Sequence, residues 1–143
     1  MSYRRNTIER TYKKYRQNKD PKVCDFCKLE TSTRDHIVKT FEHFWIVENM
    51  FKYDTWDSLN VIRHLMIIPK VHTESLIHLP AVALEEYTKI LTEYDAAGYS
   101  LYLRAMTNKS KTIPHLHTHL LLLGERRNNF HVFVRKPYFL WYK

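Results

Sequence analysis

Three histidines stand at alternate positions in the run Ile-Pro-His-Leu-His-Thr-His-Leu-Leu-Leu-Leu, as His115, His117 and His119. Alternate residues of a β-strand point to one face, so this spacing predicts three imidazoles on one surface of a sheet. Imidazole is a metal ligand, and near neutral pH it is also a nucleophile and an acid or base. The alternative is a half-buried strand in which histidines alternate by chance.

A pair of cysteines, Cys24 and Cys27, has the spacing C-x-x-C, which is typical of a redox motif or of half a zinc site, or arises by coincidence. A redox role favours a thioredoxin-like βαβ context, and the residues that follow do not have that pattern. A tetrahedral zinc site needs two further ligands. Because the chain has no other cysteine, histidines would have to supply them.

An apolar run begins at His64 and ends in Pro-Lys-Val-His at His72. Together with the alternating histidines, this run resembles the signature of the histidine triad (HIT) superfamily. That signature is His-x-φ-φ-φ-Pro-Lys-x-His followed by His-φ-His-φ-His-φ-φ, where φ is apolar. The resemblance covers roughly residues 24–124, and Thr118 occupies one of the apolar positions. It implies an α+β fold with an antiparallel sheet.

The resemblance also implies catalytic roles for three histidines. His117, the middle one, matches the nucleophile that attacks the α-phosphorus of a nucleotide. His119 would contact the phosphate and protonate the leaving group, and His64 would lie against the nucleophile, unless it is a strand-end histidine with no role. Transferase branches carry glutamine in place of the third histidine, so the resemblance favours a hydrolase. A covalent nucleotidyl-histidine would then release a nucleoside monophosphate.

In the zinc-bearing branch of this family, the ligands are the C-x-x-C pair, the last histidine of the first motif and the first histidine of the triad. The matching residues here are Cys24, Cys27, His72 and His115. The resemblance therefore implies a structural Zn²⁺ with four protein ligands, which would support the catalytic centre and not act as a Lewis acid. A single catalytic metal on all three triad histidines is the less favoured alternative.

The loop before the triad departs from the family pattern Asn-x-Gly-x-x-Gly-Gln-Ser. Thr112 matches the hydroxyl position and Asn108 matches the asparagine, so we expect these two residues and His119 to bind the phosphate. The loop has no glycine, and its backbone N–H groups can therefore wrap an anion less readily. Lys109 and Lys111 either supply positive charge to the site or belong to a solvated loop.

No clear sequence motif identifies the residues that would bind the nucleoside. The family has an aspartate shortly before the first motif that holds the ribose, and Asp54 and Asp57 are the candidates. Phe51, Tyr53 and Trp56 are either a stacking surface for the base or part of the core.

The remaining elements follow from hydrophobic periodicity. Residues 3–18 read as a basic helix, 41–49 and 61–69 as strands, 81–97 as the longest apolar helix, and 99–106 and 116–123 as strands, the last ending at Gly124. The aromatic tail, residues 130–142, would add an edge strand or pack on a partner. The pattern predicts about five antiparallel strands packed with one long helix and an additional basic N-terminal helix. We expect residues 1–22 to be an extension of a HIT-like domain that spans 23–143.

Composition limits the class of protein. The chain has 143 residues, 44% of them hydrophobic, which fits one domain with a substantial core. No apolar run approaches membrane length and the N-terminus does not resemble a signal peptide, so we expect a cytoplasmic protein without membrane association. The net charge is +8, which suits polyanionic substrates such as nucleotides.

Much of the positive charge lies in the first 22 residues, at Arg4, Arg5, Arg10, Lys13, Lys14, Arg16, Lys19 and Lys22. Such a helix binds nucleic acid or an acidic partner, or is simply solvated. The resemblance implies a homodimer formed through residues 81–97 and 99–106. The main alternative to a hydrolase is a zinc-stabilised nucleotide- or nucleic-acid-binding module with little or no turnover.

Overall fold

The computed structural model describes residues 3–20, 23–32, 34–108, 111–126, 131–135 and 138–142. Its helices are α1 (Asn6–Asn18), α2 (Leu29–Ser32) and α3 (Ala81–Ala96), with short 3₁₀ turns η1 (Phe26–Lys28), η2 (Arg34–His36) and η3 (Leu76–His78). The strands are β1 (Ile37–Thr40), β2 (Phe44–Glu48), β3 (Thr55–Trp56), β4 (Leu59–Pro69), β5 (Tyr99–Leu103), β6 (Thr118–Arg126), β7 (His131–Arg135) and β8 (Tyr138–Tyr142).

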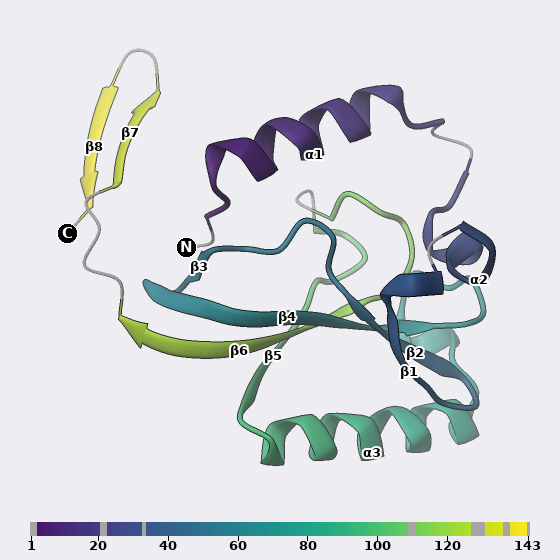
Figure 1. The fold of residues 1–143 in the computed structure, drawn as a ribbon. Helices are drawn as coiled ribbons and strands as arrows, with labels where there is room; N and C mark the ends of the chain where they lie inside the picture. The colour runs from purple at the N-terminus through teal and green to yellow at the C-terminus, as the bar shows by residue number, and fades with distance from the viewer. Residues whose placement is uncertain are drawn as a thin grey trace.

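The main sheet is antiparallel, with the strand order β1-β2-β4-β6-β5, and β3 pairs with β4. Helix α3 lies along one face of this sheet and α1 crosses the other (Figure 1). Strands β7 and β8 pair with each other in a hairpin of their own beyond β6, and they add no strand to the main sheet. The predicted α+β class with an antiparallel sheet is confirmed.

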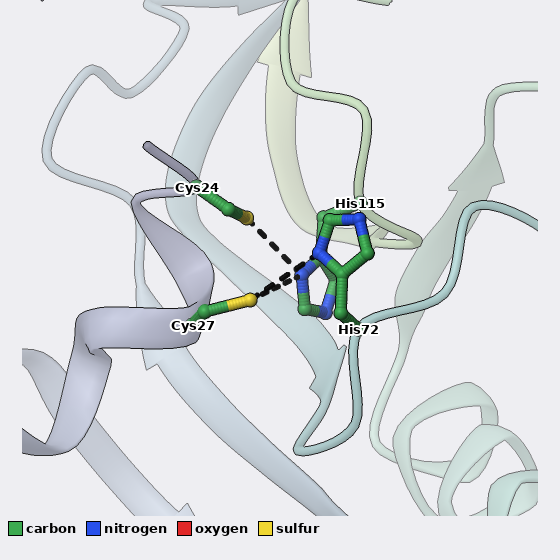
Figure 2. Close-up of side chains that lie close together, drawn as sticks. All are labelled: Cys24, Cys27, His72 and His115. Carbon is green, nitrogen blue, oxygen red and sulfur yellow. Dashed lines mark hydrogen bonds between the residues drawn. The ribbon is translucent and has the colours of Figure 1, made fainter. Parts of the chain in front are cut away.

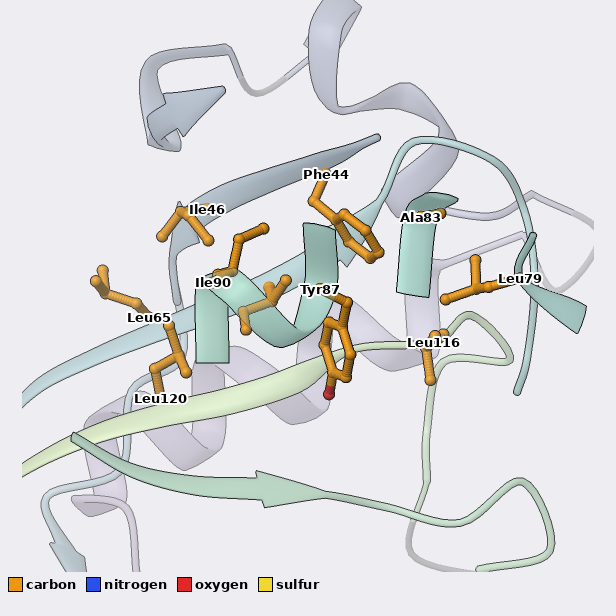
Figure 3. Packing of buried hydrophobic residues seen from close by; sticks show 10 residues of the cluster. Phe44, Ile46, Leu65, Leu79, Ala83, Tyr87, Ile90, Leu116 and Leu120 are labelled. Carbon is orange, nitrogen blue, oxygen red and sulfur yellow. The ribbon is translucent and has the colours of Figure 1, made fainter. Parts of the chain in front are cut away.

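The main core lies between α3 and the sheet (Figure 3). Tyr87 and Ile90 of α3 are buried against inward-facing residues of the central strands, including Leu65, Ile67 and Leu120. The helical spacing of the α3 apolar residues produces this single buried stripe. The Tyr87 hydroxyl is 2.6 Å from Oγ1 of Thr118, so the polar atom of this buried ring is satisfied.

Strand alternation gives the opposite face of β4 and β6 a different composition. Because Leu65 and Leu120 face α3, their neighbours His64 and His119 must face α1. Met66, which pairs in register with His119, belongs to a second apolar cluster on this face. The sheet therefore separates an apolar core on the α3 side from a histidine-bearing surface on the α1 side.

The N-terminal segment is attached to the sheet at its first residues. Tyr3 forms a β-bridge with Thr55, and the backbone N–H of Tyr3 donates to the Thr55 carbonyl at 3.0 Å. The Arg5 backbone N–H donates to the buried Asp54 carboxylate at 2.6 Å, and the Arg5 Nε lies 2.8 Å from the same carboxylate. These contacts fix where α1 begins and direct it across the histidine-bearing face (Figure 1).

The structure places two elements differently from the sequence prediction. The triad strand begins at Thr118 instead of 116 and continues past Gly124 to Arg126, so His115 and His117 lie in the segment that leads into it. The backbone N–H of Leu116 donates to the carbonyl of Thr73, which belongs to no strand, so Leu116 is not part of the ladder. Strand β1 escaped prediction because three of its four residues are exposed and it carries no apolar pattern.

Among the described residues, no helix has both the length and the apolar composition needed to cross a membrane.

Candidate active site and metal centre

Two cysteines and two histidines from three distant parts of the chain meet at one end of the central strands β4 and β6 (Figure 2). Cys24 and Cys27 flank the start of η1, His72 follows β4, and His115 precedes β6. Sγ of Cys27 is 3.2 Å from Nδ1 of His72, and Sγ of Cys24 is 3.3 Å from Nδ1 of His115. All four donor atoms lie within 4.8 Å of one another, close enough to hold one metal ion.

The orientation of His115 also suits a ligand. Its Nε2 lies 3.0 Å from the carbonyl oxygen of Pro69, which can only accept, so the ring proton lies on Nε2. Nδ1 then carries a lone pair and faces the two sulfurs. Carbonyl groups behind metal-binding histidines fix the tautomer in this way. Burial together with the neighbouring Cys24 thiol raises the pKa of Cys27 to about 11, and a bound cation would favour its thiolate instead.

His117 is oriented by the backbone of the same segment. Its Nδ1 donates to the carbonyl oxygen of His115 at 2.8 Å, so the unprotonated nitrogen is Nε2. The ring packs edge-on against Phe26, with the centroids 5.3 Å apart, and it lines a large cavity. His115, whose Nδ1 faces the two cysteine sulfurs, thus also holds the imidazole of His117 in a single tautomer.

His64 and His119 form a hydrogen-bonded pair beneath this cavity. The backbone N–H of Tyr53 donates to Nδ1 of His64, so the proton of that ring lies on Nε2, which donates to Nδ1 of His119 at 2.9 Å. Nδ2 of Asn49 lies 3.1 Å from the same Nε2, and it donates to Sδ of Met66 at 3.5 Å. The proton of His119 is then on Nε2, which has no hydrogen-bond partner among the described residues.

All three histidines are neutral near pH 7. Burial lowers the pKa of His64 to about 3 and that of His117 to about 4, and it holds the pKa of His119 well below its ordinary value. The guanidinium groups of Arg4 and Arg104 act in the same direction on His64 and His119. The site therefore presents neutral imidazoles, of which His117 offers a lone pair and His119 offers an N–H.

The cavity above these histidines has a volume of about 580 Å³ and is bounded by α1, η1 and the loop after β2. Its apolar side includes Phe26, Leu29, Val47 and Met66. On the α1 side, Tyr12 and Tyr15 lie 5.1 and 5.3 Å from the ring of Phe51. The cavity is thus closed partly by a helix that the sequence predicted only as a basic extension.

Of the two loop residues predicted to bind phosphate, Thr112 lies at the cavity and Asn108 does not. Thr112 lines the cavity, and its Oγ1 accepts a hydrogen bond from the Tyr12 hydroxyl at 2.9 Å. Among the described cavity-lining residues Asn108 does not occur; its backbone forms turns with Ala105 and Lys111. Lys111 donates through Nζ to the carbonyl oxygen of Glu74, and Lys109 lies outside the described residues.

Among the residues considered for binding the nucleoside, some line the cavity and others lie outside it. Phe51 and Tyr53 line the cavity, whereas Trp56 packs against Tyr53 and Tyr102. The Asp54 carboxylate is bound to Arg5, and Asp57 lies in an exposed turn with φ of 49°.

Sequence reasoning missed several cavity residues. Arg4, Arg104, Asn49 and Tyr12 all line the cavity, and none of them stands in a motif. Asn49 directly follows β2, and nothing in its spacing singles it out in the sequence. The other three come from segments whose approach to the site depends on tertiary packing.

The attachment of α1 can be tested at Asp54. Asp54→Asn removes the charge that binds the Arg5 N–H and guanidinium, and hydrogen bonds to charged groups contribute about 1.5–3 kcal/mol. We expect amide exchange in α1 to accelerate at least about tenfold, while exchange in α3 is unchanged. Asp57→Asn, which removes the same charge from an exposed turn, is the control. Equal exchange in α1 for both variants would show that Asp54 does not hold the helix.

Burial of neutral His64 predicts a loss of stability in acid. Because the pKa of His64 is about 3 in the folded state and near 6.5 when unfolded, only the unfolded state gains this proton as the pH falls below 6.5. His64 is hydrogen-bonded to His119, and the charged forms of Arg4, Arg104 and His117 disfavour its protonation further. Between pH 7.5 and 5.5, we expect the wild type to lose about 1.4 kcal/mol more unfolding free energy than His64→Gln, measured by urea denaturation. Parallel losses would contradict the assignment.

Comparison of the sequence with protein-family models gave no match, and comparison with curated proteins gave none either.

Solved structures match the fold. A HIT family hydrolase from Clostridium thermocellum has a TM-score of 0.53 at 21% identity, over 74% of this chain and 94% of that one. A hypothetical histidine triad nucleotide-binding protein from Sulfolobus tokodaii has a TM-score of 0.53 at 22% identity, over 78% of this chain and 77% of that one. A histidine triad protein from Clostridium difficile has a TM-score of 0.50 at 18% identity, over 79% of this chain and all (100%) of that one. The chain therefore has the fold of the histidine triad proteins.

Proposed function

We propose that this chain is a histidine triad hydrolase that cleaves a nucleotide conjugate at its α-phosphate, with His117 as the nucleophile. The observation that carries the proposal is the tautomer of His117. Its Nδ1–H is engaged by the His115 carbonyl, which leaves the Nε2 lone pair available at the cavity. An unprotonated imidazole held in one orientation is what attack on phosphorus requires.

The reaction would proceed in two displacements. In the first, Nε2 of His117 forms a bond to the α-phosphorus, and the bond to the leaving group breaks with its electron pair. In the second, water attacks phosphorus, the P–N bond breaks with its pair returning to Nε2, and a proton of the water is released to solvent. The product is a nucleoside monophosphate, and the enzyme is regenerated.

The surrounding residues support the same assignment. His119, fixed by the hydrogen bond from His64, lines the cavity, and its Nε2–H, which has no partner among the described residues, would donate to the phosphate or to the leaving atom. Thr112 offers a hydroxyl that Tyr12 now occupies, and a substrate phosphate would replace that contact. The role of Asn108 stays a prediction. The apolar side of the cavity, at Phe26, Leu29 and Val47, would receive the nucleobase.

We further propose that the Cys24, Cys27, His72 and His115 cluster binds a structural zinc ion. Two thiolates and two imidazoles are a donor set that tetrahedral zinc commonly uses. These four residues would fill the coordination shell and leave no position for substrate. The ion would tie the N-terminal segment to the sheet and hold the backbone at His115, whose carbonyl orients His117.

A homodimer is proposed by resemblance, through α3 and β5. Strand β5 is an edge of the main sheet and Leu101 on it is partly exposed, so a second copy can pair there. Light scattering on the purified protein would give the mass of a dimer, and a monomer mass at micromolar concentration would contradict the proposal.

The second candidate is a zinc-stabilised nucleotide- or nucleic-acid-binding module without turnover. The observation that favours it is the phosphate loop, which lacks glycine and in which Thr112 is bound by Tyr12. The basic α1 would add affinity for a polyanion.

Release of nucleoside monophosphate separates the two candidates. The substrates would be a nucleoside phosphoramidate and a dinucleoside polyphosphate, each incubated with the zinc-loaded wild type. Turnover that His117→Ala abolishes supports the hydrolase. A folded protein that binds these compounds or an oligonucleotide in a salt-dependent manner, but releases no monophosphate, would instead favour the binding module.

A further inference from the structure

Two arginines that no motif predicts lie on the same side of the catalytic histidines. Arg4 precedes α1 and Arg104 follows β5, and both line the cavity with His117 and His119. Their guanidinium groups flank Tyr53. Arg4 Cζ lies 4.3 Å from the centre of the Tyr53 ring, and Nη2 of Arg104 donates to its hydroxyl at 3.0 Å. The two cations are thus brought to one buried aromatic side chain.

Tyr53 connects these cations with the pair of histidines beneath the cavity. Its ring stacks on His64, with centroids 5.1 Å apart and an interplanar angle of 17°, and it lies 6.1 Å from the ring of His119. Phe26, which begins the apolar side of the cavity, instead contacts His117. The cavity therefore has an apolar end and a cationic end, and His119 faces the cationic one.

The cationic end is built in advance of any ligand. The Arg4 side chain is 16% exposed, and its Nε donates to the Phe51 carbonyl at 2.8 Å. The Glu9 carboxylate lies 3.6 Å from Nη1 of Arg4, and its side chain is more exposed than that of Arg4. Positive charges that are already held in place stabilise negative charge that develops in a reaction.

The chemistry of the leaving group determines whether the cationic end of the cavity can assist its departure. In the proposed first displacement, an uncharged amine can depart only if it gains a proton. A neutral imidazole such as His119 donates a hydrogen bond but is a poor source of a full proton. A phosphate leaves as an anion when the P–O bond breaks and its electron pair stays on the bridging oxygen. It needs positive charge and hydrogen bonds, which the cationic end provides.

We propose that Arg4 and Arg104 form a subsite for a negatively charged leaving group, so that the preferred substrates are nucleotides joined to further phosphate, as in dinucleoside polyphosphates. This inference rests on the proposed hydrolysis at the α-phosphate. The two arginines would favour a polyphosphate substrate over a conjugate with an uncharged amine. The histidines alone would not discriminate between these two classes of substrate.

The test compares kcat/KM for a dinucleoside polyphosphate with kcat/KM for a nucleoside phosphoramidate of an uncharged amine. The wild type is expected to favour the polyphosphate. Arg104→Gln and Arg4→Gln are expected to lower that ratio at least about tenfold each, since a charge-assisted hydrogen bond is roughly twice as strong as a neutral one. Arg104→Lys keeps the charge and should lose less. Arg10→Gln, on the exposed part of α1, is the matched control and should keep the wild-type ratio.

A wild type that favours the phosphoramidate, or a ratio that both glutamine variants leave unchanged, would overturn the subsite while the hydrolase remains. The subsite is also tested without turnover, by titrating the intact dinucleoside polyphosphate into His117→Ala and into His117→Ala with Arg104→Gln. Binding about tenfold weaker in the double variant supports the subsite, and equal binding overturns it. Absence of turnover on both substrates would instead contradict the proposed hydrolase.

Discussion

His117→Ala is expected to lower kcat/KM for monophosphate release by at least about a thousandfold, because removal of a covalent nucleophile eliminates the reaction path and not merely one contact. The variant should still fold and bind substrate. His117 contributes one hydrogen bond, from Nδ1 to the His115 carbonyl, and its ring is only one wall of the cavity. The measurement is steady-state kinetics on whichever of the two substrates, phosphoramidate or dinucleoside polyphosphate, the wild type cleaves faster. The wild type and the variant must have the same metal content and the same midpoint of thermal unfolding.

The covalent intermediate gives a second measurement of the same prediction. Rapid acid-free quenching of the wild type with substrate should yield a chain heavier by one nucleotidyl group, attached at His117 and labile in acid. His78→Ala, a change of the same type at an exposed histidine, should form the adduct normally. A variant at His117 that retained turnover, or an adduct located on another residue, would exclude His117 as the nucleophile.

The parts of this site that could be predicted from the sequence are those fixed by short-range spacing. Cys24 and Cys27 are close because a single turn of chain joins them. His64 and His72 stand at the two ends of one apolar strand, whose period sets which side chains share a face. In the structure, the same alternation places Leu65 and Leu120 in the core on the opposite face. The alternation does not show that β6 begins only at Thr118, so that His115 and His117 precede the strand.

Contacts over long sequence separations could not be predicted in this way. Tyr12 and Thr112 are 100 residues apart, and no pattern in either segment implies that their hydroxyls meet. The periodicity of residues 3–18 predicts a helix but not the face of the sheet that it covers, because that depends on the bridge between Tyr3 and Thr55 and on the Asp54 clamp. Arg4 reaches the cavity through these contacts, whereas Arg104 follows β5, which is placed by its pairing with β6. In the sequence, both are ordinary basic residues.

Removal of the metal is expected to have the largest effect on stability. An ion that binds the folded state alone at a thousandfold excess over its Kd contributes about 4 kcal/mol to the free energy of unfolding. His72→Ala removes one of the four proposed ligands, and His72 is not among the described residues that line the cavity. We expect zinc analysis to fall from one ion per chain to a small fraction, and the midpoint of thermal unfolding to fall accordingly, as it should for the wild type in a strong chelator.

His78→Ala, the exposed histidine nearby, should leave zinc content and unfolding unchanged. Enzyme activity is a third measurement, and it would not change if the ion stabilised only the segments that bind it. Because the His115 carbonyl holds the tautomer of His117, loosening His115 should lower kcat more than it raises KM. Added zinc should restore the chelated wild type but not His72→Ala. A wild type purified without zinc, and whose unfolding a chelator leaves unchanged, would show that the two cysteines and two histidines do not hold a structural ion.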